Sequence, residues 1–356
     1  MSGDRAMLPG LSLAELEALV KTLGEPGYRA RQVNDWLKKG CDFEEMKNLP
    51  QALIEKLKAV SIAQPAGIIS RKVSALDGTE KYLFSMMDGH CVEGVLMRYR
   101  HGLSLCLSTQ VGCRMGCAFC ASTLEGKLRD LAAGEMVGMA LQVNRLCGKE
   151  RVGNMVLMGS GEPLDNYDEV MRFLRIISSV DSLNIGIRRI SLSTCGLPDK
   201  IKRLAREGLP VTLSVSLHAP NDGVRRQIMP IAKSVAMDTL LDACRDYAQV
   251  TGRRVVFEYA LIRGVNASLE DARELASRLK GMLCHVNLIP LNDVPERALR
   301  AATAQEISAF LQTLEKLGIS VTVRREMGAD ISGACGQLRA QHLKNPPTHQ
   351  KEEKNP

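Results

Sequence analysis

Apolar residues recur at helical spacing through the first sixty positions of the chain. Three segments follow this pattern, at residues 13–23, 28–40 and 49–60. Ser12 and Glu15 stand three residues apart ahead of the first segment, which is the spacing of a capping box. The pattern therefore predicts a small N-terminal helical domain over residues 1–62.

The pattern changes after this region. Short runs rich in β-branched and aromatic residues, such as "KYLFSMM" and "CVEGVLMRY", are separated by Asp77-Gly78 and Asp88-Gly89. Asp-Gly between two strand-like runs is typical of a β-hairpin turn. Residues 63–100 are therefore predicted to form a β-hairpin extension.

From residue 101 onward, strand-like segments alternate with segments of helical periodicity. After a first strand in "LSLCLSTQVGC", the strand candidates are residues 153–163, 187–196, 210–220, 254–262, 284–292 and 319–325. Regular alternation predicts an α/β fold with a parallel sheet. Six or so units are fewer than the eight of a full barrel, so a partial (β/α)6 barrel is predicted over residues 101–340. The polar tail at 341–356 is predicted to be disordered.

The predicted strands end in polar or glycine-rich runs. These are "GSGEP", "STCG", "SLHAP", "PLN" and the later "MGADISGACGQL". In parallel α/β folds, the chemistry lies beyond the carboxyl ends of the strands. The candidate site is therefore expected at this end of the sheet.

Composition and charge narrow the class of protein. The 356 residues carry a net charge of +7, and 24% of them are charged, as in ordinary globular enzymes. No apolar run approaches the about 20 residues of a membrane span and no signal peptide is evident, so a cytoplasmic protein is expected. Between Arg188 and Arg263, 13 Lys or Arg stand against 7 Asp or Glu. This surplus suits a phosphate-rich partner or an ordinary solvated surface, and charge alone leaves both open.

Three of the eleven cysteines, Cys113, Cys117 and Cys120, lie in the run "CRMGCAFC" after a predicted strand. In a cytoplasmic protein, clustered thiols are typical of metal binding or redox chemistry. Three thiolates can hold three irons of a [4Fe–4S] cluster and leave the fourth iron open. A structural zinc ion takes four protein ligands and would need a distant fourth residue here.

The order of the motifs resembles one enzyme family. The spacing CxxxCxxC after the first strand of a β/α barrel is similar to that of the radical S-adenosylmethionine (SAM) superfamily. The runs that accompany it are "GSGEPLDN", "RRISLSTCGL", "SVSLHAPND", "NLIPLN" and "DISGACGQL". Together they resemble the RlmN/Cfr family of adenosine methyltransferases over residues 12–340. The resemblance implies that the open iron of the cluster binds the amino and carboxylate groups of SAM.

The resemblance also implies roles for Cys335, Cys106 and Glu93. Carbon 2 of adenine is electron-poor and does not attack the methyl group of SAM, but a carbon radical can add to it. Cys335 matches the family's methyl-carrying cysteine. Cys106 matches the resolving cysteine, which should face Cys335 and form a transient disulfide with it. Glu93 matches a proton acceptor. Without the resemblance, the two cysteines would suit a buried core and Glu93 a solvated surface.

SAM-binding positions are implied along the strand ends. The carboxylate of Glu162 and the carbonyl of Gly161 suit an ammonium group. The other matching positions are Ser193, Ser216, Leu217, His218 and Asn292. His218 alone would suit a general base, but its place in "SLHAP" favours cofactor binding. Cys195 departs from the family's pattern and adds a thiol near these positions.

The resemblance therefore implies a radical SAM methyltransferase acting on carbon 2 of adenosine. Its substrates would be 23S rRNA near the peptidyl transferase centre and an adenosine beside the anticodon in tRNA. Two SAM molecules per turnover, a flavodoxin-like reductant and a monomer are expected.

Two alternatives stay open. One is Cfr-type methylation of carbon 8, against which "GEPL" and "NLIPLN" argue. The other is a non-catalytic iron–sulfur or zinc RNA-binding protein, which would show no SAM turnover.

Overall fold

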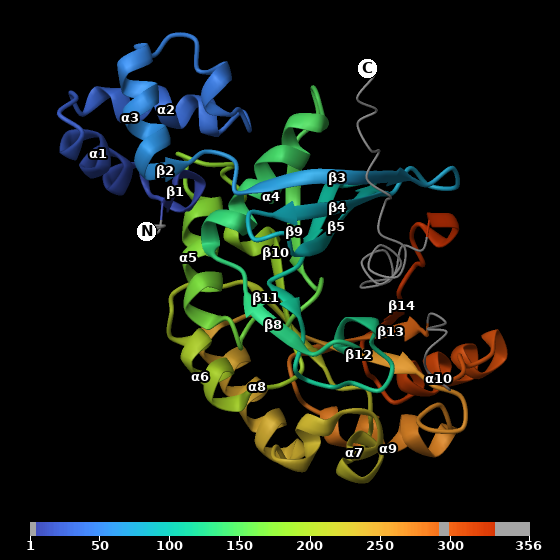
Figure 1. Cartoon of the computed structure of the whole chain (residues 1–356). Helices are drawn as coiled ribbons and strands as arrows, with labels where there is room; N and C mark the ends of the chain where they lie inside the picture. The colour runs from blue at the N-terminus through green and yellow to red at the C-terminus, as the bar shows by residue number, and fades with distance from the viewer. Residues whose placement is uncertain (1–4, 292–298, 332–356) are drawn as a thin grey trace.

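The computed structural model describes residues 5–291 and 299–331 of the chain. A group of short helices at the N-terminus is followed by a large curved sheet, which helices cover on its outer side (Figure 1). Every helix in the described part of the chain is too short or too polar to cross a lipid bilayer. The predicted α/β class is confirmed.

Three helices build a separate small core at the N-terminus. They are α1 (Leu13–Thr22), α2 (Tyr28–Leu37) and α3 (Gln51–Val60). Their buried faces contribute Leu16, Val20, Val33, Leu53 and Leu57 to this core. The predicted capping box is confirmed, because the Ser12 hydroxyl accepts the Glu15 N–H (3.3 Å) and the Glu15 carboxylate accepts the Ser12 N–H (2.8 Å).

One sheet of ten strands forms the centre of the fold, in the order β14-β13-β12-β11-β10-β9-β6-β5-β4-β3. Its antiparallel part is β3 (Ala66–Val73), β4 (Glu80–Met86), β5 (Cys91–Tyr99) and β6 (Gly102–Leu107). Its parallel part continues from β6 into β9 (Val152–Leu157), β10 (Ile190–Thr194), β11 (Thr212–Ser216), β12 (Val255–Leu261), β13 (Cys284–Pro290) and β14 (Val321–Val323). Among the described residues, β3 and β14 each pair on one side only, so the barrel is open.

The predicted hairpins form and join the main sheet. Asp77-Gly78 and Asp88-Gly89 occupy the two turns between β3, β4 and β5, with φ of 70° at Gly78 and 81° at Gly89. Because β5 pairs with β6, these strands extend the barrel sheet directly. The predicted domain limits at residues 62, 100 and 340 stay predictions.

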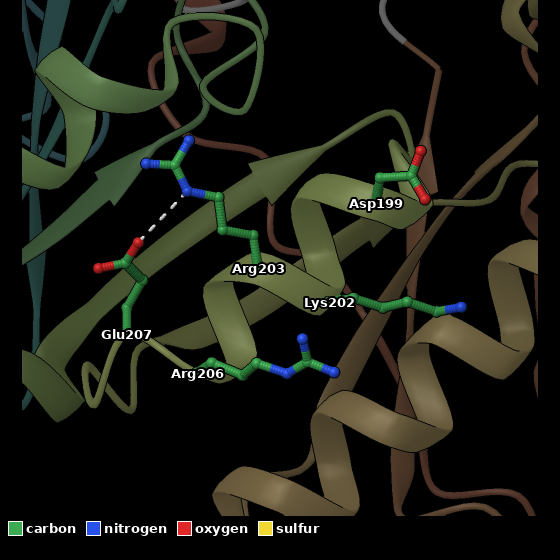
Figure 2. A pocket seen from close by; sticks show the side chains of 5 residues that line it. All are labelled: Asp199, Lys202, Arg203, Arg206 and Glu207. Carbon is green, nitrogen blue, oxygen red and sulfur yellow. Dashed lines mark ion pairs between the residues drawn. The ribbon is translucent and has the colours of Figure 1, made fainter.

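Helices cover the outer face of the sheet. They are α4 (Ala133–Leu146), α5 (Tyr167–Ser178), α6 (Pro198–Ala205), α8 (Met237–Thr251), α9 (Leu269–Leu279) and α10 (Ala304–Lys316). Their solvent sides are charged. At α6, the side chains of Asp199, Lys202, Arg203, Arg206 and Glu207 line a shallow hollow that faces outward (Figure 2). In this hollow Arg203 Nε lies 3.6 Å from Glu207 Oε1.

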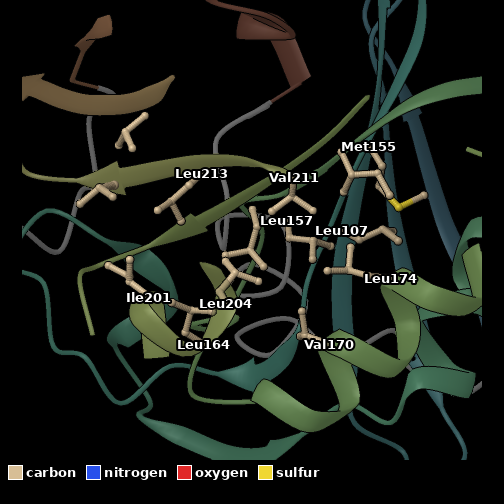
Figure 3. Packing of buried hydrophobic residues seen from close by; sticks show 14 of the residues in the cluster. Leu107, Met155, Leu157, Leu164, Val170, Leu174, Ile201, Leu204, Val211 and Leu213 are labelled. Atoms are coloured by element: carbon tan, nitrogen blue, oxygen red, sulfur yellow. The ribbon is translucent and has the colours of Figure 1, made fainter. Parts of the chain in front are cut away.

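The inward sides of the helices are apolar and pack against every second strand residue. Leu157, Leu192 and Leu213 stand side by side on β9, β10 and β11. Figure 3 shows Leu157 and Leu213 beside Ile201 and Leu204 of α6, all within the main hydrophobic core. This outer face therefore supplies the packing that holds the sheet.

The inner face of the sheet carries polar residues beside a few apolar ones. Side chains alternate along a strand, so the residues between the core leucines point to this face. One row across β4, β5, β6, β9 and β10 consists of Lys81, Val95, Cys106, Val156 and Ser191. Nearer the carboxyl ends lie the pair Ser193 and Ser214 and the row Ser216, Glu258 and Asn287. Helix-covered parallel strands are normally apolar on both faces, so this face is the expected side for chemistry.

The N-terminal unit contacts α4 through two glycines, and this contact generates a prediction. A Cβ atom at Gly10 would lie 2.8 Å from the Cα atom of Gly134. Gly10→Ala is expected to lower the free energy of unfolding by about 1–3 kcal/mol, because one backbone segment must move away from the other. Denaturation followed by the fluorescence of the single tryptophan, Trp36, measures the change.

The matched control for this experiment is Gly186→Ala, because a Cβ atom at Gly186 meets nothing within 4 Å. This substitution should change the free energy of unfolding by less than about 0.5 kcal/mol. Equal losses of stability in the two variants would contradict the close approach of Gly10 to Gly134.

Candidate functional site

The loop that carries the three clustered cysteines is anchored by a small antiparallel pair. This pair consists of β7 (Gln110–Gly112) and β8 (Lys127–Asp130). Gly112 has a φ of 77°, and a Cβ atom there would overlap the carbonyl oxygen of Gly126. The Cys113 N–H donates to the same oxygen at 2.9 Å. Asp165, which follows β9, accepts from Lys127 Nζ at 3.0 Å and ties the pair to the main sheet.

The three thiols of this loop are close to one another and largely shielded from water. Cys113 and Cys117 are buried, and Cys120 is half-buried. Burial, together with the nearby Cys120, raises the pKa of Cys113 to about 11. Burial also raises the pKa of Cys117, with Cys120 and Cys113 adding to the effect. Protonated thiols of this kind lose their protons when they bind metal.

The arrangement fits a cluster better than a single ion. Within the described residues, no three His, Cys, Asp or Glu side chains meet as ligands of one metal ion. A single zinc ion requires its ligands to converge on one point, whereas each iron of a [4Fe–4S] cluster takes its own thiolate. Three neighbouring thiols on one shielded loop therefore match the predicted iron–sulfur cluster.

The cysteine loop is covered by the end of α7 (Asp222–Ile228) and the residues after it. The Ala118 N–H donates to the Ile228 carbonyl at 2.8 Å. Ile228 and Met229 form an apolar cluster with Cys117 and Cys195. The loop is thereby brought against the carboxyl ends of β10 and β11.

Gly161 and Glu162 follow β9 in a tight turn. Gly161 has a φ of 107°, and a Cβ atom there would lie 2.7 Å from the Cβ of Gln110. The buried Glu162 carboxylate accepts the Leu164 N–H at 3.0 Å and the Cys195 N–H at 2.6 Å. Burial raises its pKa, although these N–H donors act in the opposite direction. The side chains of Thr194 and Cys195 also hydrogen-bond to this carboxylate.

His218 is a buried, neutral hydrogen-bond donor. It has a φ of 55°, which is uncommon for a residue with a side chain. Its Nδ1 accepts the Ala260 N–H at 2.9 Å, so in the neutral ring the proton is on Nε2. Burial, with the positive charge of Arg225, lowers its pKa to about 3. The ring of Phe119 packs edge-on against the imidazole ring, with 4.7 Å between the two ring centroids. This contact links His218 to the cysteine loop.

The other predicted SAM positions on β10 and β11 differ in what they offer. Ser193 and Ser216 are half-buried on the polar inner face. The Leu217 side chain instead packs in the main core, and its N–H donates to the Glu258 carbonyl at 3.1 Å. Leu217 therefore offers the site its backbone and not its side chain. Asn292 lies outside the described residues.

Sequence reasoning missed Glu258 and Asn287, which lie beside Ser216 in the same row. Asn287 Nδ2 donates to Glu258 Oε2 at 2.9 Å. Glu258 is buried, and burial raises its pKa. The available signal was the polar residue between apolar neighbours in "VFEYA" and "HVNLI". This signal points to the site only when the pairing of the strands is known, because the pairing places Glu258 and Asn287 beside Ser216.

Glu93 and Cys106 lie on the polar inner face. Cys106 stands opposite Val95, two residues from Glu93 on β5, so the two predicted residues are diagonal neighbours. The Glu93 carboxylate is buried and lies 3.2 Å from the ammonium group of fully buried Lys81. Glu93 is thus not the solvated surface residue that its hairpin position alone would suggest.

The last described segment of the chain is tied to the β3–β4 turn beside this pair. Asp77 accepts the Gly328 N–H at 2.9 Å. Asp330 accepts from the Ser74 hydroxyl at 2.6 Å and from the Ala75 N–H at 2.8 Å. Burial acts to raise the pKa of Asp77, but its N–H donors outweigh burial and hold it at about 2.

Met327, in the same segment, packs in one apolar cluster with Cys106. The chain therefore passes Cys106 eight residues before Cys335, and Cys335 itself lies outside the described residues. The charged hollow on α6 (Figure 2) is separate from all of these side chains, because it opens on the outer side of the helix layer.

Comparison with known proteins points to one family. A family model of the Radical SAM superfamily matches residues 107–279, and one described as the ribosomal RNA large subunit methyltransferase N-terminal domain matches residues 7–63. The chain is 53% identical to a probable dual-specificity RNA methyltransferase RlmN from Alkaliphilus oremlandii, over 96% of this chain and 100% of the relative. It is 49% identical to the protein of the same description from Clostridium novyi, over 94% of this chain and 98% of the relative.

A solved structure gives the same result. The crystal structure of a radical SAM methyltransferase from Sphaerobacter thermophilus is 44% identical, covers 94% of this chain and 98% of its own, and superposes with a TM-score of 0.90. The predicted partial barrel and the resemblance are thereby confirmed. The radical SAM superfamily uses a [4Fe–4S] cluster and SAM, which are the two cofactors predicted from the sequence.

His218 is expected to stay neutral between pH 5 and 8. The pKa of His218 is about 3 in the folded protein and 6.5 in an ordinary, exposed histidine. As the pH falls, the ring is therefore protonated in the unfolded chain before it is protonated in the folded protein. The stability that neutral His218 contributes above pH 6.5 is therefore lost as the pH falls toward 3. 15N NMR of the chain labelled at its six histidines measures the ring state. Comparison with His218→Gln identifies the NMR signal of His218. A titration midpoint near pH 6.5 would contradict the hydrogen bond from the Ala260 N–H to His218 Nδ1.

Proposed function

Since the chain belongs to the RlmN family of RNA methyltransferases within the radical SAM superfamily, we propose that it methylates carbon 2 of adenosine. The proposed substrates are an adenosine of 23S rRNA near the peptidyl transferase centre and an adenosine beside the anticodon in tRNA. The relatives' description as dual-specificity RNA methyltransferases supports two classes of RNA substrate.

The cofactors are assigned to residues as follows. Cys113, Cys117 and Cys120 hold the cluster, which is supported by their shared, shielded loop. When bound, the cluster supplies one electron to SAM, whose cleavage to 5′-deoxyadenosine and methionine starts the radical chemistry. SAM contacts Gly161, Glu162, Ser193, Ser216, Leu217, His218 and Asn292.

The geometry of the described SAM positions suits a molecule with an ammonium, a ribose and a base. The Glu162 carboxylate and the Gly161 carbonyl accept from the ammonium group. The hydroxyls of Ser193 and Ser216 suit the ribose. His218 donates through Nε2 because Nδ1 is already occupied. A neutral His218 that only donates is a binding group and not a general base.

Cys335, Cys106 and Glu93 handle the methyl group and the proton. Cys335 accepts a methyl group from one SAM and later carries it to carbon 2 as a methylene radical. Glu93 accepts the proton that carbon 2 loses, and the Lys81 ammonium balances its buried charge. Scission of the carbon–sulfur bond leaves a thiyl radical on Cys335, which forms the disulfide with deprotonated Cys106. The surplus electron would return to the cluster, and a proton on the released methylene carbon completes the methyl group.

One observation carries this proposal. The register of the sheet puts Cys106 and Glu93 on the same inner face as Ser193 and Ser216, with the cysteine loop against the carboxyl ends of those strands. A structural iron–sulfur or zinc protein would not need a resolving thiol and a paired carboxylate there. We further propose a cytoplasmic monomer that receives its electrons from a flavodoxin-like protein.

Nucleoside mass spectrometry tests the proposed function directly. 2-Methyladenosine is expected in rRNA and tRNA of cells that contain this protein and should disappear from both when it is deleted. 8-Methyladenosine in its place would favour the carbon-8 alternative. Absence of both nucleosides, with no 5′-deoxyadenosine from the reduced protein and SAM, would favour the non-catalytic alternative.

Cysteine variants test the assigned roles. Cys335→Ala should abolish methyl transfer while iron content and RNA binding stay at the level of the wild type. Cys106→Ala should accumulate a covalent protein–RNA adduct, visible as a shifted band on a denaturing gel. Cys147→Ala is the control, because this thiol lies at the end of α4 and donates to the Val143 carbonyl. A Cys106→Ala enzyme with normal turnover and no adduct would rule out the resolving role.

A further inference from the structure

Arg225 is a fully buried arginine beside the cysteine loop. It lies on α7, and its side chain has no exposure to solvent. Nη2 donates to the Cys195 carbonyl at 2.6 Å and Nε to the Leu217 carbonyl at 3.3 Å, with the Ser216 carbonyl 3.5 Å from Nη2. The guanidinium therefore joins the ends of β10 and β11 at the place where SAM is proposed to bind. All three acceptors are neutral.

No carboxylate in the described part of the chain forms an ion pair with Arg225, and Asp222 acts on it only through its charge. The Arg225 Nη1 atom is buried without a hydrogen-bond partner among the described residues. Asp222, on the same helix, instead accepts the Met237 N–H at 2.9 Å. An arginine keeps its proton in proteins, and burial of a charge without an ion pair is strongly unfavourable. An anion bound next to Arg225 would therefore stabilise its buried charge.

The cysteine loop is the place where an anion is expected. Cys117 and Cys195 belong to one apolar cluster next to α7. The charge of Arg225 acts on both of these thiols. Three thiolates with a [4Fe–4S] core carry a net negative charge, and this charge grows by one unit when the cluster takes up an electron. A nearby fixed cation stabilises the more negative state.

We propose that Arg225 raises the reduction potential of the cluster held by Cys113, Cys117 and Cys120, and so eases its reduction by a low-potential one-electron donor. The inference rests on the proposed function, since it requires the cluster. Arg225 acts as a positioning residue: the cluster gains one electron, and no bond to Arg225 forms or breaks. Its hydrogen bonds to the strand-end carbonyls fix the charge in place.

An EPR-monitored redox titration of the cluster-loaded full chain without SAM tests the proposal. In Arg225→Met the midpoint potential should become more negative than in the wild type. Arg225→Lys, which keeps the charge and loses the planar fork, should stay close to the wild type. The matched control is Arg226→Met, because Arg226 is exposed one residue further along the chain and should leave the potential unchanged.

The outcomes separate a charge effect from a structural one. Equal shifts in Arg225→Lys and Arg225→Met would assign the effect to the lost carbonyl contacts and overturn the proposal. An unchanged potential in Arg225→Met would overturn it as well, and so would a shift that appears only when SAM is present, because the anion would then be the SAM carboxylate.

Two further measurements keep the test decisive. If Arg225→Met does not retain the cluster, Arg225→Gln is used in its place, because the amide keeps a hydrogen-bond donor without the charge. An unchanged midpoint potential in Arg225→Gln then overturns the proposal. Iron content and a reduced EPR signal in the wild type are recorded first. Their absence would contradict the proposed function itself, whereas a normal wild-type cluster with no effect of Arg225 contradicts this inference alone.

Discussion

In a sheet that helices cover on one side, each strand residue that faces the helices is followed by one that faces the interior. In this chain the alternation separates the residues that pack against the helices from the candidate site residues. Leu105 and Leu107 pack in the main core, and Cys106 between them points to the inner face. The same holds for Phe257 and Glu258. A shift of the register by one residue would bury the polar set among the helices and turn the leucines inward, so packing and chemistry specify the same register.

The interior accommodates polar groups by giving each a fixed partner. Glu162 accepts two backbone N–H groups, His218 accepts the Ala260 N–H, and Glu93 lies beside Lys81. Most of these partners are backbone groups at strand ends, where the sheet ladder no longer uses them. Arg225 differs, because its guanidinium donates hydrogen bonds only to carbonyl groups within the described residues. A site built in this way is organised before its cofactors arrive.

Local patterns predicted a large part of this arrangement. The capping box at Ser12, the two Asp-Gly turns and the alternation of strands with helices depend on residues close together in sequence, and each was predicted. Glu258 and Asn287 were missed because their place beside Ser216 follows from pairing between distant strands. Arg225 and Arg226 are adjacent and identical in type, and only the packing of α7 decides which one is buried. Glu93 was predicted through the family resemblance, while its burial came from the pairing of β4 with β5.

The open edge of the sheet has a mechanical consequence. In a closed barrel the hydrogen-bond ladder fixes the radius, and the barrel cannot widen unless ladder bonds break. In the described part of this chain the two edge strands are not paired with each other, and three hydrogen bonds that Asp77 and Asp330 accept hold the last segment to the β3–β4 turn. Water can replace those three bonds one at a time. The separation of the two edges is therefore set by side-chain contacts with this turn, and the hydrogen-bond ladder of the sheet does not fix it.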